Sequence, residues 1–230
     1  VNGNLKQALD TPSNVYATLN PLENYYPNNT FSNGNLKIVT NSTNYSPNTA
    51  TLGFSKGKWY WEAKIVSNAQ SDVFGISGRT NPGGNQNELG HHADQYGFNS
   101  YSGVLRNNDS DTSYASAFNT NNNIVQIAVD VDNLKMYLGI NGTWQNSADP
   151  ASGTGGVTIG AISATTDGVY YPAVSDFSSN SGTYEFNFGN GYFGTTAITS
   201  AGSNGNGSLF EYDVPSGYYA LNTKNINTYG

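Results

Sequence analysis

The chain has 230 residues, with 36% hydrophobic residues, only 11% charged residues and a formal net charge of −7. This acidic balance disfavours nucleic acids and anionic membranes as partners, because both are bound through basic surfaces. The low charge also argues against intrinsic disorder, and the absence of cysteine excludes disulfides and thiolate ligands.

No apolar run reaches transmembrane length, so we expect no membrane insertion, and no signal peptide is visible. The chain begins at Val1 rather than Met, so we expect a processed protein or a piece of a longer one. No long segment has convincing helical periodicity, and turn residues recur every several positions. This pattern predicts an all-β fold built from many short strands.

Residues 1–50 are polar and interrupted by prolines. Short strands are predicted at Tyr16–Leu19 and Leu36–Thr40, the second after an Asn33-Gly34 turn. We expect residues 1–50 to form an N-terminal wrapping segment whose strands add to the sheets.

Residues 51–190 contain the main run of predicted strands. In the most informative one, Trp59 and Trp61 alternate with Tyr60 and Glu62, the period-2 pattern of a half-buried strand. Two indoles on one face predict the core of a sandwich, and Glu62 and Glu185 are expected on exposed sheet faces. The predicted strands are Thr51–Phe54, Trp59–Val66, Val73–Ser77, Gln95–Asn99, Ile124–Asp130, Leu134–Ile140, Val157–Ile162, Tyr170–Ser175 and Thr183–Phe188.

The strongest hairpin signal is the pair Ile124–Asp130 and Leu134–Ile140, joined by a short polar turn. Residues 78–94 and 103–123 are predicted as long polar loops, which are usually functional or mobile. Inward-facing side chains are expected at Trp59, Trp61, Ile127, Val129, Met136, Leu138 and Phe188. Residues 191–230 are interpreted as a polar tail, with an ordered piece at Leu209–Pro215 and a junction to a following module.

The sequence patterns that suggest a phosphate, metal or calcium site are incomplete. Gly53–Lys58 has neither the spacing nor the following helix of a phosphate-binding loop. The adjacent His91 and His92 are interpreted as solvated loop residues, because neighbours on an extended chain point in opposite directions. Side chains around Asp130 are expected to cap a hairpin turn rather than to bind calcium.

Two alternatives stay open at this stage. The segment Asp109-Ser110-Asp111 could join a calcium site in a loop, and a sandwich could host a glycosidase with paired carboxylates. The glutamates that are candidates by residue type are Glu62, Glu88, Glu185 and Glu211. Because no nucleophile, base or metal-ligand motif survives, we predict no enzyme, no catalytic residue, no cofactor and no metal.

Several segments, in order, resemble SPRY (B30.2-like) domains. They are GKWYWEAKI at 57–65, Phe74–Ser77, Tyr96–Phe98, the hairpin at 124–144, Tyr170–Ser175 and Glu185–Gly189. The resemblance covers roughly residues 52–190. It implies an antiparallel β-sandwich of the SPRY or concanavalin-like jelly-roll type, which binds through its loops and performs no chemistry.

The tail carries a narrower resemblance. Residues Phe210–Asn225, together with Asp10–Asn14 and Thr30–Asn35, resemble segments that flank SPRY-like units in structural proteins of tailed phages, especially marine phages. This resemblance implies a non-enzymatic virion module in a tail fibre, an adhesin or a capsid-surface decoration, located on the extracellular virion surface. Its partners would be other virion subunits, including copies of itself, or a host-surface glycan or protein.

Aromatic residues are scattered through the predicted loops among Gly, Asn and Ser, a composition typical of recognition loops. Tyr96, Phe98 and Phe118 are expected in the core. The predicted ligand- or partner-binding residues are Arg79, Tyr101, Arg106, Tyr114 and Trp144. The alternative for the two arginines is that they pair with Asp94 or Asp109. Two alternative functions remain: a lectin-like or glycan-processing jelly roll, and a cellular SPRY adaptor that binds peptides.

Overall fold

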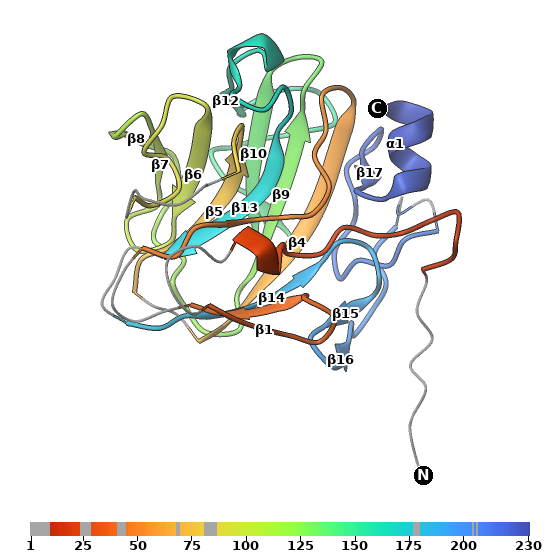
Figure 1. The fold of residues 1–230 in the computed structure, drawn as a ribbon. Coiled ribbons are helices and arrows are strands. Elements are labelled where there is room, and N and C mark those ends of the chain that lie inside the picture. The colour runs from red at the N-terminus through yellow and green to blue at the C-terminus, as the bar shows by residue number, and fades with distance from the viewer. Residues whose placement is uncertain are drawn as a thin grey trace.

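The computed structural model describes residues 10–23, 29–40, 45–67, 70–80, 87–176, 180–203, 205 and 207–230. Strands dominate this part of the chain, and nearly all of them pair antiparallel in two sheets packed into a sandwich (Figure 1). The prediction of an all-β antiparallel sandwich is confirmed.

The larger sheet, called sheet 1 below, contains most of the long strands. Its order is β1 (Thr30–Ser32), β2 (Lys37–Val39), β14 (Thr183–Asn187), β4 (Lys58–Ser67), β9 (Ile124–Asp130), β10 (Lys135–Ile140) and β11 (Thr143–Trp144). Two short strands join it from the side: β12 (Val157–Thr158) pairs with β10, and β17 (Tyr219–Ala220) pairs with β4 in parallel.

The smaller sheet, called sheet 2, has the order β3 (Asn48–Thr49), β13 (Tyr171–Asp176), β5 (Asp72–Ser77), β6 (Gln95–Asn99), β7 (Val104–Asn107) and β8 (Ser110–Ser113). The remaining elements are the hairpin β15 (Tyr192–Phe193) with β16 (Thr196–Ala197), two 3₁₀ turns, Pro21–Glu23 and Ile162–Ala164, and the helix α1 (Thr223–Tyr229). Strands β1, β2 and β3 come from residues 1–50 and extend both sheets.

The main core lies between the two sheets. Cross-strand partners in sheet 1 stack the predicted inward residues: Trp59 faces Val129, and Trp61 faces Ile127. All seven predicted core side chains are buried, at Trp59, Trp61, Ile127, Val129, Met136, Leu138 and Phe188. Tyr96, Phe98 and Phe118 are buried as well, which confirms their assignment to the core.

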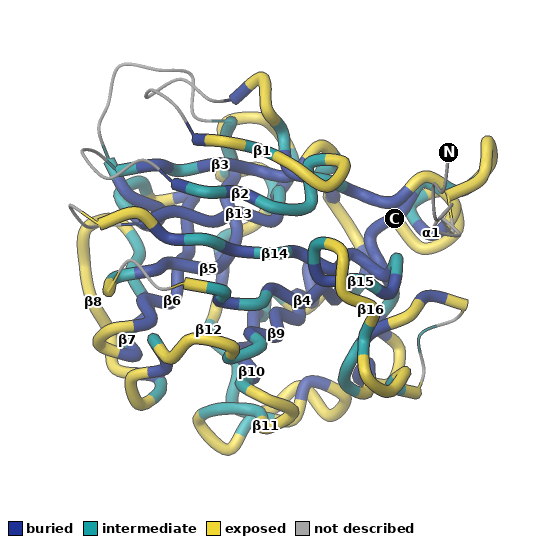
Figure 2. Tube along the Cα trace, turned by 90° about the horizontal axis from the view of Figure 1, so that it is seen from below, coloured by how far each residue is buried: buried dark blue, intermediate teal, exposed yellow. Residues whose placement is uncertain are grey.

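A second core covers the outer face of sheet 1. It joins the sheet residues Tyr60, Ala128 and Tyr137 to Tyr16 and to the C-terminal residues Phe210, Val214, Tyr218 and Ala220. Figure 2 shows the result, because β4 and β9 are dark blue along most of their length. The larger sheet is therefore buried on both faces here, with the C-terminal segment as its outer layer.

Some predicted element bounds are wrong. No continuous strand forms at Thr51–Phe54; only Phe54 bridges to Tyr170, although its side chain still reaches the core. The predicted loop 103–123 contains β7 and β8, which are joined at Asn108 and Asp109, both with positive φ. Two consecutive positive-φ residues, favoured by Asn and Asp, match the twist of a tight hairpin.

Candidate binding site

Glu62 anchors the C-terminal segment to sheet 1. Its carboxylate accepts hydrogen bonds from the backbone N–H of Glu211 and of Tyr212, both at 2.9 Å, and from the Tyr60 hydroxyl at 2.9 Å. The expectation that Glu62 lies on an exposed face is wrong, because its side chain is fully buried. The alternation placed Glu62 on the outer face correctly, but the C-terminal segment covers that face.

Burial changes the chemistry of this carboxyl group. Loss of hydration raises the pKa of Glu62 from 4.5 to about 7, while the hydrogen bonds from Glu211, Tyr212 and Tyr60 act in the opposite direction. The pKa of Tyr60 is also raised, by burial and by the neighbouring Glu62 carboxylate. Glu62 has no partner of opposite charge among the ion pairs of the described residues.

Gln126 continues this network towards the surface. Its amide Nε2 donates to the Tyr60 hydroxyl at 3.1 Å, and its Oε1 accepts from the backbone N–H of Gly142 at 2.7 Å. Both ends of a buried amide are therefore fixed. Gly142 lies in the turn between β10 and β11 and has a φ of +82°, a conformation that favours glycine.

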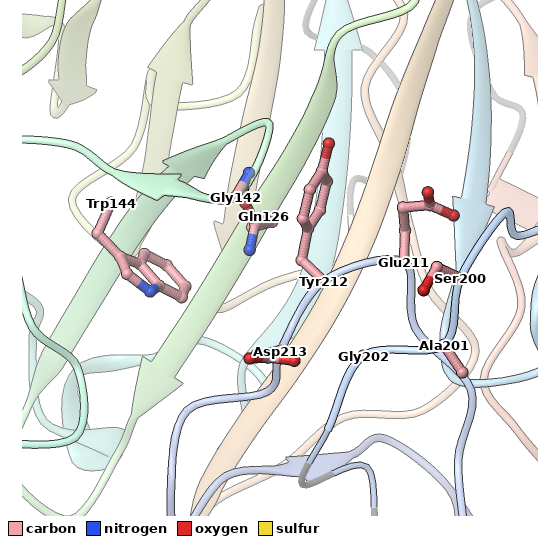
Figure 3. Close-up of a pocket in the computed structure, with 9 residues that line it drawn as sticks. All are labelled: Gln126, Gly142, Trp144, Ser200, Ala201, Gly202, Glu211, Tyr212 and Asp213. Carbon is pink, nitrogen blue, oxygen red and sulfur yellow. Dashed lines mark hydrogen bonds between the residues drawn. The ribbon is translucent and has the colours of Figure 1, made fainter.

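A pocket of about 320 Å³ opens above Gln126, between the β10–β11 turn and the C-terminal segment. Figure 3 shows Trp144 and Tyr212 on the two sides of Gln126. The Tyr212 ring packs on the turn, since a Cβ on Gly142 would lie 2.8 Å from its Cδ1. The lining residues are Gln126, Gly142, Trp144, Ser200, Ala201, Gly202, Glu211, Tyr212 and Asp213.

Two carboxylates border the pocket, and each is held by a nearby loop. Glu211 accepts a hydrogen bond from the backbone N–H of Thr199 at 2.7 Å, and Asp213 accepts one from that of Ser203 at 2.7 Å. The hydrogen bonds from Ser203 lower the pKa of Asp213. These contacts fix the two acidic side chains in position. The lining residues include no lysine, arginine or histidine.

The five predicted binding residues do not converge on one surface. Tyr101 is exposed at the turn between β6 and β7, and Trp144 is half-buried in the pocket of the other sheet. Tyr114 is only 8% exposed, its ring packs on Phe98 with 4.8 Å between ring centroids, and its hydroxyl donates to the Gly155 carbonyl. Tyr114 therefore supports the core rather than a binding surface.

Both predicted arginines are engaged in ion pairs. Arg79 Nε lies 2.8 Å from Asp94 Oδ1, and Arg106 bridges Glu88 and Asp111, with 2.8 Å from its Nε to Asp111 Oδ1. The Arg106–Glu88 pair joins the loop around residues 88–94 to β7, and the Arg79–Asp94 pair joins the same loop to the chain that follows β5. Residues 81–86 of the predicted loop 78–94 lie outside the described residues.

The other chemical candidates are structural in the described part of the chain. Asp130 accepts from the backbone N–H of Asn133 at 3.0 Å, which confirms its role as a hairpin cap. His91 Nδ1 contacts Asp109 Oδ1 at 2.7 Å. Among the described residues, no three His, Asp or Glu side chains are grouped so that they could hold a metal ion. No described helix is long and apolar enough to cross a membrane.

Among the pocket residues, Tyr212 and Asp213 were missed as part of a site, and Glu211 was named only as a candidate carboxylate by residue type. Their only signal was the ordered aromatic and acidic run at Leu209–Pro215 within a tail of small polar residues. Periodicity cannot find such a site, because it depends on which face of sheet 1 the tail covers.

Comparisons with known proteins identify the family. The family model for the SPRY domain matches residues 58–191. Among solved structures, the crystal structure of the SPRY domain of human HERC1 is similar, with 19% sequence identity and a TM-score of 0.49, covering 66% of this chain and 87% of that chain. A search of curated proteins gives no significant match. SPRY domains are jelly-roll modules for protein interaction, and since the family model spans more than half of the chain, this protein belongs to the SPRY domain family.

Proposed function

We propose that this chain is a non-enzymatic binding module of a tailed-phage virion, in a tail fibre, an adhesin or a capsid-surface decoration. It would hold a neighbouring virion subunit or a host-surface ligand, and it would lie on the outside of the particle. The coarse part of this function follows from the SPRY family, and the virion setting rests on the resemblance of the tail to phage structural proteins.

One observation carries the proposal. The residues with the phage-type pattern, Phe210–Asn225, are an integral part of the sandwich rather than a separate appendage. Phe210 and Tyr218 fill the outer core, β17 pairs with β4, and the Asn222 side chain caps α1 by accepting from the backbone N–H of Asn225 at 2.8 Å. Because Phe210–Asn225 is part of the folded sandwich, its resemblance to tailed-phage structural proteins concerns the binding module itself. This supports a virion role for the module.

The test is the location of the protein in purified particles. Antibodies raised against the folded chain should label intact virions by immunogold electron microscopy, and the chain should co-purify with particles through a density gradient. Presence in infected-cell lysate but absence from intact, gradient-purified virions would refute the virion proposal. It would then favour a cellular SPRY adaptor.

Binding is tested separately by competition. The purified chain should reduce adsorption of the particle to its host, or block assembly with the neighbouring subunit. Tyr101→Ala and Trp144→Ala should each fold and yet compete less well than wild type, because both side chains reach the surface. If both variants compete like wild type, these two residues do not form the contact surface.

A further inference from the structure

We propose that the pocket between the β10–β11 turn and the C-terminal segment takes a basic side chain, preferably the guanidinium of an arginine, from a protein partner. Most of its lining residues lie between positions 200 and 213, beyond the segment 58–191 that matches the SPRY family model. The inference rests on the proposed binding function but not on the virion location.

The first argument is charge. Glu211 and Asp213 both line the pocket, and neither forms an ion pair within the described part of the chain. No lysine or arginine is among the nine lining residues. Two carboxylates at one opening, without a cation, attract a positively charged group and repel phosphates, sulfates and acidic peptides.

The second argument is the pair of aromatic rings. Trp144 and Tyr212 stand on the two sides of the pocket floor (Figure 3). A guanidinium is planar and weakly hydrated, so it stacks on indole and phenol rings while its N–H groups reach carboxylates. A lysine ammonium gains the same charge attraction but lacks the flat face. The combination therefore favours arginine over lysine.

The third argument is size and rigidity. A pocket of about 320 Å³ is at the small end for ligand sites, so it suits one side chain better than a large ligand. Its floor is preformed, because Gln126 is fixed by Tyr60 and by the Gly142 backbone. Little ordering is needed on binding, which favours affinity.

Trp144 also provides the assay. The other two tryptophans, Trp59 and Trp61, are buried in the main core, so a change of fluorescence on adding a ligand reports on Trp144. The full chain is titrated with N-acetyl-Gly-Arg-Gly-amide, with the lysine analogue, and with the citrulline analogue, which has the shape of arginine without its charge. Glucose, galactose and N-acetylglucosamine are titrated in parallel.

We expect the arginine peptide to perturb Trp144 fluorescence and the amide resonances of residues 199–213, and to bind at least about tenfold more tightly than the citrulline peptide. Binding should weaken as salt is added. Binding of the arginine peptide to Trp144→Ala is measured by NMR, and it should be about threefold to thirtyfold weaker, which is the range for a stacked cation. Asp213→Asn keeps the acceptor oxygen for Ser203 and should weaken binding about twofold to fivefold.

A matched control lies on sheet 2. Asp109→Asn removes an exposed carboxylate, and Asp109 does not line the pocket. This variant should bind the arginine peptide like wild type. Equal affinity for arginine and citrulline, saturation by a sugar without binding of the arginine peptide, or no binding of any probe would each overturn the proposal. Particle labelling can fail while peptide binding succeeds, so the two proposals fail separately.

Discussion

Replacing Glu62 by Gln should remove a pH dependence of stability that the wild-type chain has. The carboxyl group is fully buried under the C-terminal segment, and its pKa is raised from 4.5 to about 7, chiefly by burial. Glutamine has nearly the same shape and does not titrate. The comparison therefore isolates the ionisation of Glu62 from the loss of its packing.

The sign follows from linkage. Between pH 4.5 and about 7 the unfolded chain has lost the Glu62 proton, while the folded chain still holds it. A raised folded pKa gives a contribution to stability that is fully present below pH 4.5 and is lost as the pH rises through about 7. The two pKa values differ by an amount that corresponds to about 3 kcal/mol of unfolding free energy.

The assay is urea unfolding of wild type and Glu62→Gln at intervals from pH 4 to 8. At low pH the variant should be less stable, because Glu211 and Tyr212 donate to different oxygens of Glu62 and glutamine has only one acceptor oxygen, so one of these two backbone hydrogen bonds is lost. This deficit should shrink by about 3 kcal/mol as the pH rises to 7.5. If the deficit at low pH is smaller than that, the variant becomes the more stable protein at pH 7.5. Asp176, buried in sheet 2, has a pKa raised to about 7 by burial and titrates in an overlapping window, so both proteins keep that part of the dependence.

The reasoning is refuted if the two stability curves run parallel from pH 4 to 8. A deficit that grows with pH would show the opposite: the hydrogen bonds to Glu62 would outweigh its burial and hold it ionised. Adding Asp176→Asn to Glu62→Gln should flatten the remaining dependence, which identifies both carboxyl groups as its source.

Three further changes test the packing. Trp61→Ala should lower the unfolding free energy by about 3–5 kcal/mol, because the indole is buried in the main core, and a loss under about 1 kcal/mol would place it elsewhere. Arg106→Ala should cost about 2 kcal/mol, since the buried Glu88 loses its cation. Arg106→Lys keeps the positive charge and should cost less, so an equal loss of stability in the two variants would argue against this cause. Gly142→Ala should lower the unfolding free energy by about 1–3 kcal/mol and shift the fluorescence emission of Trp144, because the φ of Gly142 is +82° and a Cβ would press on Tyr212. Emission and stability equal to those of wild type would show that the turn tolerates a side chain.

The sandwich was predictable because its evidence is local. Alternation in β4, and the matching parity of β9 and β10, fix which side chains share a face, and the short polar turn fixes the hairpin register. Trp59, Trp61, Ile127 and Met136 are therefore found where the pattern put them. Resemblance to SPRY segments supplied the order of the remaining strands.

What covers each face was not predictable in the same way. Alternation put Glu62 on the outer face, but exposure depends on a contact between residues 62 and 211–212, far apart in sequence. The same holds for two predicted binding residues. From the sequence, Arg79 and Arg106 could bind a partner or pair with Asp94 or Asp109, and the fold pairs Arg79 with Asp94 and Arg106 with Glu88 and Asp111. A single sequence carries no signal for the contact between Glu62 and residues 211–212, and it does not decide which nearby acid each arginine meets.

The physical unit is longer than the family match. The match ends at residue 191, but Phe210, Val214 and Tyr218 cover Tyr60 and Tyr137, which would otherwise be exposed on sheet 1. The same segment supplies the two backbone N–H groups that satisfy the buried carboxylate at position 62. Chain ends far apart in sequence also meet there, since the Ala17 N–H donates to the Leu221 carbonyl. A chain cut after residue 191 would expose an aromatic surface around an unsatisfied carboxyl group and would lose the pocket, so the tail is as much a part of the folded domain as the strands that define its family.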